Sequence, residues 1–223
     1  MERITIDIVS DVVCPWCYLG KARLDLAIAE VQDEVGVEIN WRPYQLNPDY
    51  PPEGVDHHKA LAAKLGGQDK VDQAHAMLSG LGREVGIAFD FAAVKISPNT
   101  MDAHRLALWA HVEGREIQDK VVTLLFKANF EQGLNVGDHD VLLDIAEQAG
   151  LDRAVIATLL FSDADRDTVA NEIDAARQMG VSGVPFFVFD QQYAVSGAQT
   201  PDVLVTALRD ISRMKAEARS ALA

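Results

Sequence analysis

Cys14-Pro15-Trp16-Cys17 is the stretch that decides the fold, and it holds both cysteines of this 223-residue chain. The run before it, residues 4–9, is rich in β-branched residues and is typical of a strand. The segment after it, residues 21–35, spaces its apolar residues as one face of a helix does. The cysteine pair is therefore predicted to lie at a junction between a strand and a helix.

The four-residue motif has the features of a helix N-terminus. Pro15 suits the first helical position, where its missing N–H group costs nothing, so we expect Cys14 to cap the helix. The unpaired amides and the dipole of a helix stabilise an anion at this end, which favours a nucleophilic Cys14 thiolate near neutral pH. Cys17 lies three residues later on the same helix face, where it can form a disulfide with Cys14 or resolve a mixed disulfide.

Three other interpretations of the pair are less favoured. A purely structural disulfide would constrain the unfolded chain little, because the loop that it closes is short. A zinc site normally needs a second pair of ligands, and the sequence offers only the adjacent His57 and His58. Two inert core cysteines fit poorly with a pair that brackets Pro15 in a turn. The pair therefore predicts redox chemistry without a metal.

A second signal lies far along the chain, where a proline precedes an apolar run. Val184-Pro185 leads into Phe186 to Phe189, which has the composition of a buried strand. The first residue of a strand is one of the few sheet positions open to proline. Taken alone, Pro185 is an ordinary trans proline at a strand edge. Beside a redox cysteine pair, it also fits a cis-proline loop that offers backbone groups to an extended peptide.

The remaining patterns give the order of the elements. Residues 37–41 alternate apolar and polar side chains and predict a second strand. From about residue 55 to Met179 the pattern is helical, with breaks at glycines and at Ser97-Pro98. Residues 186–195 then predict a β-hairpin, and Thr200-Pro201 predicts the start of a last helix. The order is strand, helix, strand, many helices, hairpin and helix.

Three separated groups of residues carry a resemblance to a known family. They are Ser10 to Gly20 around the cysteines, Pro98-Asn99-Thr100 with Ala103-His104-Arg105-Leu106, and Gly183-Val184-Pro185 with Ser196-Gly197-Ala198-Gln199. Together they resemble the DsbA-like thioredoxin superfamily and, within it, the FrnE-like branch. The resemblance implies an α/β fold, in which a thioredoxin fold is split by a large all-helical insertion. The expected parts are residues 1–50 and 179–223 for the thioredoxin half and 51–178 for the insertion.

The resemblance also implies an activity and a set of site residues. The activity is that of a thiol–disulfide oxidoreductase or disulfide isomerase, with Cys14 as the attacking thiolate and Cys17 as the resolving thiol. The dipeptide Pro15-Trp16 would tune the redox pair, and Val184-Pro185 would form a cis-proline loop facing the substrate. The partners implied are disulfide-containing proteins or small thiols. No cofactor is required, and a homodimer is left open.

Two further residues are placed near the redox face by the same resemblance. Asn99 begins a predicted helix, and His104 follows one turn later, so both are candidates for substrate binding. The plainer interpretation makes Asn99 a helix cap and His104 a partly buried structural residue. For the pair His57-His58 we expect only solvated side chains.

A related group keeps an alternative function open. Kappa-class glutathione transferases and 2-hydroxychromene-2-carboxylate isomerases typically have serine where Cys14 stands, and they use glutathione. The presence of both thiols favours redox exchange, with glutathione as a conceivable co-substrate. A third hypothesis is a non-catalytic redox sensor or chaperone that uses the fold as a binding surface.

Two carboxylates near the motif were given roles of their own. Asp7 lies in a strand expected to be covered on both faces, where it could shuttle a proton for Cys17, or it could be a solvated strand-end residue. Asp11 is three residues before Cys14, where an inward negative charge would oppose the thiolate. We therefore expect Asp11 to turn outward or to cap locally.

Composition excludes several classes of protein. A hydrophobic content of 48% is ample for a packed core, and a net charge of −14 argues against binding to a nucleic-acid backbone. No apolar stretch approaches the length of a membrane span, and the sequence begins without the pattern of a signal peptide. These features predict a cytoplasmic protein, in which the cysteine pair would rest largely as a dithiol.

Overall fold

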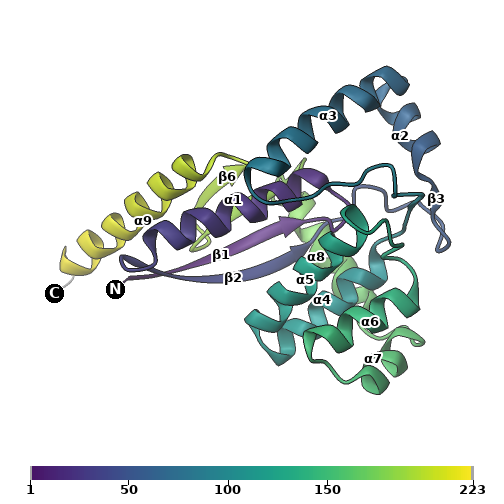
Figure 1. Ribbon diagram of the computed structural model, residues 1–223. Coiled ribbons are helices and arrows are strands. Elements are labelled where there is room, and N and C mark those ends of the chain that lie inside the picture. Colours follow the sequence, from purple (N-terminus) through teal and green to yellow (C-terminus); the bar gives the residue numbers. More distant parts are fainter. Residues whose placement is uncertain (1, 222–223) are drawn as a thin grey trace.

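A four-stranded mixed sheet forms the centre of the molecule (Figure 1). The computed structural model describes residues 2–221; Met1 and residues 222–223, at the outer ends of two of the expected parts, lie outside the described residues. The strand order is β2-β1-β5-β6, with β1 at Glu2–Ser10, β2 at Val35–Pro43, β5 at Phe186–Phe189 and β6 at Tyr193–Ser196. β1 pairs parallel with β2 and antiparallel with β5, as a thioredoxin fold requires.

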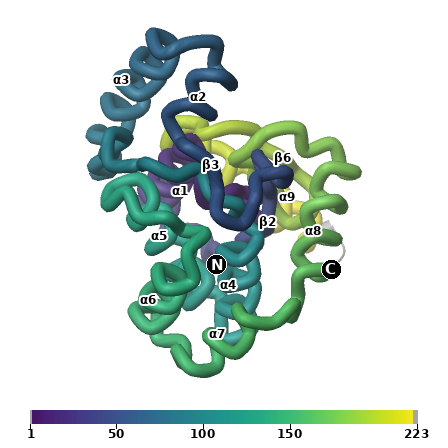
Figure 2. The backbone as a smooth tube through the Cα atoms, turned by 90° about the vertical axis from the view of Figure 1, so that its right-hand side faces the viewer, coloured from purple at the N-terminus to yellow at the C-terminus, as the bar shows by residue number. Residues whose placement is uncertain are grey.

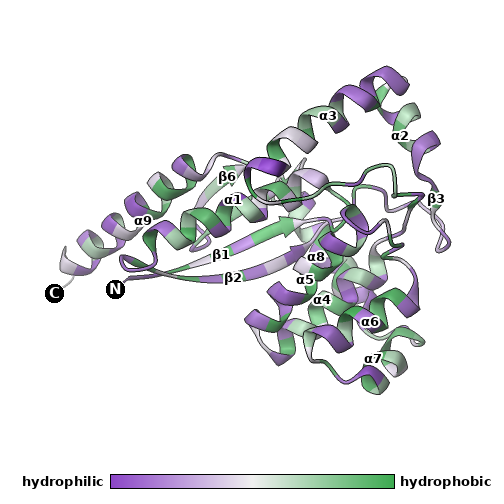
Figure 3. Cartoon of the chain, viewed as in Figure 1, coloured by the Kyte–Doolittle hydropathy of each residue, from purple (hydrophilic) through white to green (hydrophobic). Residues whose placement is uncertain are grey.

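The two faces of the sheet are covered by different helices. Ile4, Ile6 and Ile8 of β1 are almost fully buried, and they share a core with α1 (Pro15–Val31) and α9 (Pro201–Ala221). Because side chains alternate along a strand, Val9 points to the other face. There it packs in a small cluster with Ala176 of α8 (Arg166–Gln178). Figure 3 shows the resulting pattern, with hydrophobic residues along β1 and mixed surfaces on the helices.

Between β2 and β5 the chain forms the predicted helical insertion. It contains α2 (His57–Leu65), α3 (Gln68–Glu84), α4 (Met101–Glu113), α5 (Arg115–Phe130), α6 (His139–Ala149), α7 (Arg153–Leu160) and α8. Helices α4 to α7 have a hydrophobic core of their own, whereas α2 and α3 extend to the opposite end of the molecule (Figure 2).

The insertion is not purely helical, which corrects one expectation. Two short strands, β3 (Val55–Asp56) and β4 (Ile96–Ser97), pair antiparallel at the base of α2. Two residues are too few to produce an alternating pattern, so the sequence carried no signal for them. Among the described residues, no helix combines the length and the apolar character that crossing a membrane demands.

Candidate active site

The cysteine motif lies where the sequence placed it, at the turn from β1 into α1. Cys14 is extended and immediately precedes the helix, and Pro15 takes the first helical position. The first turn of α1 contains no acidic residue, so the positive end of the helix dipole faces Cys14 without a competing charge. This geometry favours an anionic sulfur at Cys14.

Cys17 has a different environment from Cys14. Both cysteines are free thiols and both are buried, with 4% of Cys14 and 1% of Cys17 exposed. Burial raises the pKa of the Cys17 thiol well above its usual value, and the hydrogen bond and charge of Cys14 act in the same direction. Cys17 is therefore a protonated thiol at neutral pH, held behind the sulfur that approaches the surface.

The proline loop of the C-terminal part meets the cysteines as expected. The Val184-Pro185 peptide bond is cis, and the Cys14 thiol donates to the carbonyl oxygen of Val184 with an Sγ–O distance of 3.6 Å. Gly20 makes this approach possible, because a Cβ atom there would lie 2.9 Å from the side chain of Pro185. Residues far apart in the sequence thus meet around one sulfur atom.

A cleft of about 370 Å³ opens beside Cys14. One side is formed by the motif and the proline loop, including Trp16 and Val184, and the other side by α2 and α3. Trp16 is 36% exposed, so it stands at the edge of the cleft. The volume is in the range of small-molecule sites, and the lining is mostly apolar.

Asn99 and His104 lie outside this cleft, which is a correction for both substrate-binding predictions. The side chain of Asn99 accepts hydrogen bonds from Gln45 and from the backbone N–H of Met101, and it donates to the carbonyl oxygen of Tyr50. His104 is 5% exposed, and its Nε2 atom lies 2.9 Å from the carbonyl oxygen of Tyr44. Both residues hold the loop after β2, so their role in the structure is to position that loop.

The two carboxylates were also misjudged from the sequence. Asp11 is fully buried instead of turning outward; it accepts the backbone N–H of Leu46 at 2.8 Å and lies 3.4 Å from Nε2 of His104. Asp7 does not serve Cys17, because its carboxylate is taken by Asn40 at 3.1 Å and by Arg42 at 2.9 Å. The physical reason is the same in both cases: a partner from β2, the following loop or α4 satisfies the charge.

His57 is not the solvated side chain that was expected. It lines the cleft, its Nδ1 atom is 2.9 Å from the Ser97 hydroxyl, and burial lowers its pKa to about 4. The imidazole is therefore neutral at physiological pH. Asn129, which sequence reasoning did not select, also lines the cleft and is 2% exposed. A lone asparagine near the end of a helix gives no signal in the sequence, so only the folded chain identifies it.

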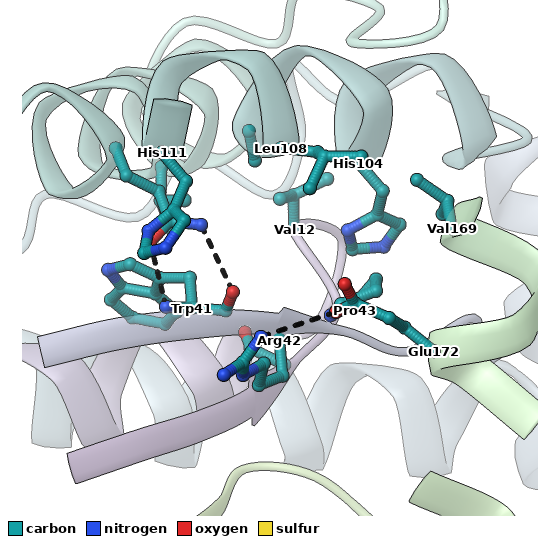
Figure 4. A pocket seen from close by; sticks show the side chains of 13 residues that line it. Val12, Trp41, Arg42, Pro43, His104, Leu108, His111, Val169 and Glu172 are labelled. Atoms are coloured by element: carbon teal, nitrogen blue, oxygen red, sulfur yellow. Dashed lines mark hydrogen bonds and ion pairs between the residues drawn. The ribbon is translucent and has the colours of Figure 1, made fainter. Parts of the chain in front are cut away.

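A second and much smaller hollow of about 30 Å³ lies between α4 and the end of β2 (Figure 4). It is lined by Ser10, His104 and Ala107, among others, and Figure 4 shows His104 and His111 reaching down from α4 toward Trp41, Arg42 and Pro43. Ser10 and Asp11 each have a buried oxygen atom without a regular hydrogen bond to the described residues. No group of three or more His, Cys, Asp or Glu side chains in residues 2–221 could hold a metal ion.

Comparison with known proteins agrees with this fold and site. The model of the DSBA-like thioredoxin domain family matches residues 5–209, so the chain belongs to that family. A probable DsbA oxidoreductase from Streptomyces coelicolor is 32% identical, with a TM-score of 0.82 over 93% of this chain and 89% of that one. The uncharacterized protein YwbO of Bacillus subtilis is 27% identical over 95% of this chain and 99% of its own length.

More distant structures share the fold alone. A 2-hydroxychromene-2-carboxylate isomerase is 20% identical, with a TM-score of 0.69 over 96% of this chain and 98% of the other. The cytosolic disulfide reductase DsbM from Pseudomonas aeruginosa with GSH is 16% identical, with a TM-score of 0.62 over 94% and 99%. The expected DsbA-like thioredoxin fold is thus confirmed, and the FrnE-like branch stays a prediction.

Proposed function

We propose that this chain is a thiol–disulfide oxidoreductase or disulfide isomerase that works through Cys14 and Cys17. One observation carries the proposal: Cys14 occupies a helix N-terminus beside an open cleft, while burial keeps the pKa of Cys17 raised. One sulfur is thus ready to attack and the other is held in reserve. Pro15 and Trp16 are proposed to tune the pair, and Val184-Pro185 to face the bound substrate.

The reaction follows from the two thiols. The Cys14 thiolate attacks one sulfur of a substrate disulfide, a Cys14–substrate disulfide forms, and the other substrate sulfur leaves as a thiolate. Cys17 then gives up its proton to the leaving thiolate or to water and attacks the Cys14 sulfur, which releases the second substrate thiol. The substrate has gained two electrons and the protein holds a Cys14–Cys17 disulfide. An external thiol, such as a low-molecular-weight thiol or a reductase dithiol, restores the pair.

Isomerisation uses the first step alone. If a second thiol of the substrate attacks the mixed disulfide before Cys17 does, the substrate keeps its oxidation state and exchanges its pairing. The high pKa of Cys17 gives the substrate time for this exchange, since little Cys17 thiolate is present. A cytoplasmic setting would keep the pair reduced and would suit reduction or isomerisation, in line with the cytosolic reductase among the structural neighbours.

A second candidate is a glutathione-using isomerase or transferase. It is supported by the fold shared with a 2-hydroxychromene-2-carboxylate isomerase and with a reductase whose structure contains GSH. In this case glutathione would bind at the start of α1 as a co-substrate. The presence of Cys17 behind Cys14 favours the disulfide reaction over this alternative.

One set of assays separates the two candidates. Insulin reduction and the refolding of a scrambled disulfide protein should proceed with the wild type and should stop with Cys14→Ser. Cys17→Ser should keep the first attack and accumulate covalent mixed disulfides, which intact-mass spectrometry detects. Glutathione conjugation or chromene isomerisation that survives Cys14→Ser would instead establish the second candidate.

A further inference from the structure

The cleft beside Cys14 is free of acidic side chains, although the protein as a whole is strongly acidic. The chain has 34 Asp and Glu residues and a net charge of −14, yet none of the described residues that line the cleft is acidic. The one ammonium group, that of Lys64, belongs to an exposed side chain and donates to Asn47 Oδ1 at 3.2 Å. The interior of the cleft therefore offers no charge to a ligand.

Two polar atoms in this apolar lining have no hydrogen-bond partner among the described residues. They are Nε2 of His57 and Oδ1 of Asn129, and both atoms are buried. A buried polar atom left unpaired normally costs free energy, so each such atom needs an explanation. A ligand that enters the cleft can satisfy both.

The chemistry of the two atoms limits the ligand that they can bind. The Ser97 hydroxyl holds Nδ1 of His57 at 2.9 Å, which leaves Nε2 as the free polar atom of that ring. Because burial keeps this imidazole neutral, it attracts no anion at physiological pH. The Asn129 oxygen accepts a hydrogen bond, so its partner must carry an N–H or O–H group. The pair thus matches an uncharged group such as an amide.

We propose that the cleft selects disulfides whose sulfur carries an apolar, uncharged group with an amide, and that His57 and Asn129 hydrogen-bond that amide. The inference rests on the proposed function and names the substrate class of the same site. The selected group is the half of the substrate that stays on Cys14 after the first attack. Its sulfur forms the new bond to Cys14, while the other half leaves as a thiolate and is later protonated by water.

The test uses four small disulfides of similar length and different charge. N,N′-diacetylcystamine carries neutral amides, dipropyl disulfide is apolar without an amide, cystamine is a dication and 3,3′-dithiodipropionate is a dianion. The Cys17→Ser protein traps each adduct on Cys14, and intact-mass spectrometry gives the rate. Each rate is divided by the rate of the same disulfide with free cysteine, which removes differences in intrinsic reactivity.

The expected result is a clear preference for the amide. We expect the normalised rate for N,N′-diacetylcystamine to exceed those for both charged disulfides by about tenfold or more, which corresponds to one well-placed hydrogen bond and an uncharged lining. The net charge of −14 attracts cystamine over long range, so a low rate for cystamine reports on the cleft itself. Repeating the series at high salt removes the long-range effect on the dianion.

Variants of the two anchors give the second half of the test. Asn129→Leu and His57→Phe keep nearly the same volume and should each lower the amide rate about fivefold, while the dipropyl disulfide rate changes less than twofold. Asn129→Asp should also lower the amide rate and raise that of cystamine, because it adds a carboxylate. Lys59→Ala, on the same helix as His57 but outside the cleft lining, is the matched control.

The outcomes separate this inference from the proposed function. Rapid reaction of all four disulfides without preference would overturn the selectivity and leave the oxidoreductase intact. An unchanged ratio of amide to dipropyl rates in Asn129→Leu and His57→Phe, with normal alkylation of Cys14 by iodoacetamide, would overturn the two anchors. No disulfide reacting faster with Cys14 than with free cysteine would overturn both the inference and the proposed function.

Discussion

The two hollows that flank the redox motif differ in size, chemistry and depth. The cleft beside Cys14 has a volume of about 370 Å³ and an apolar lining, whereas the hollow beside Ser10 and His104 has about 30 Å³ and several polar groups. Each region contains two buried polar atoms without regular hydrogen bonds, His57 Nε2 and Asn129 Oδ1 on one side and oxygen atoms of Ser10 and Asp11 on the other.

The difference separates the two steps of the reaction. The cleft is large enough for the substrate half that Cys14 captures, so its residues should control the first attack. The small hollow has room for little more than a water molecule, and it lies on the side of Cys17, where burial raises the thiol pKa. Its residues should control stability and the second attack. The following predictions test this division.

The largest effect is expected from removing the buried histidine of the small hollow. His104→Ala loses the hydrogen bond to the Tyr44 carbonyl and leaves the fully buried Asp11 without its neighbour, so the free energy of unfolding should fall by about 3 kcal/mol. Urea denaturation measures this change. His75→Ala, which removes a half-buried ring stacked on Phe91 in the cleft, should cost about 1 kcal/mol. Equal losses would contradict the division.

Filling each hollow should give opposite patterns. Ala107→Leu adds volume beside a small closed space and should destabilise the protein by about 2 kcal/mol, with little change in Cys14 reactivity per folded molecule. Ala74→Leu adds the same volume to the open cleft, so it should change stability by less than about 0.5 kcal/mol and slow adduct formation at Cys14. Urea denaturation and adduct mass spectrometry compare the two. A stable Ala107→Leu with impaired attack would reverse the assignment.

The neutral histidine of the cleft predicts a dependence of stability on pH. Burial lowers the His57 pKa from 6.5 to about 4, so between these values the unfolded chain binds a proton that the folded chain does not. This contribution to stability is complete above pH 6.5 and is lost as the pH falls toward 4. After allowance for solvent screening we expect a loss of roughly 1 kcal/mol.

The measurement compares the wild type with His57→Gln by urea denaturation at pH 7.5 and pH 5. The wild type should lose more stability between these pH values than the variant, because carboxylates elsewhere contribute equally to both. A variant that loses as much as the wild type would show that His57 titrates normally and is not buried in the cleft.

The smallest effect concerns the second attack. The Ser10 hydroxyl lies close enough to Cys17 to lower its thiol pKa, against the larger effect of burial. Ser10→Ala should raise that pKa further, reduce the thiolate fraction and slow the release of a preformed Cys14 mixed disulfide about threefold at neutral pH. Stopped-flow release of the bound thiol checks this. The first attack should stay unchanged, and a slower first attack would place Ser10 on the wrong side of the division.

Local patterns sufficed for the main elements of the fold. A β-branched run, a proline at the first helical position and glycine breaks depend on neighbours in the sequence, so they predicted β1, the start of α1 and the helical insertion. The β5–β6 hairpin was predicted to within one residue. The same local rules could not supply the β3–β4 pair, because its strands have two residues each.

The buried polar groups were the least predictable part. Asp11 and His104 look like a cap and a helix residue in the sequence, but their surroundings come from Tyr44 and Leu46 in the loop after β2. Arg105 is a clearer case: it is fully buried, and its guanidinium donates to the carbonyl oxygens of Leu159, Ser162 and Ala164. Partners so distant in the chain leave no pattern near the residue that they satisfy.

The sequence by itself determined the redox motif and the order of strands and helices, because helix capping and side-chain periodicity are set by adjacent residues. The tertiary structure decided which cysteine approaches the surface and which carboxylates are buried. It also decided that His57 and Asn129, from α2 and α5, share one cleft with Cys14. Burial and long-range contacts arise only when separate elements pack, so no stretch of the chain contains that information alone.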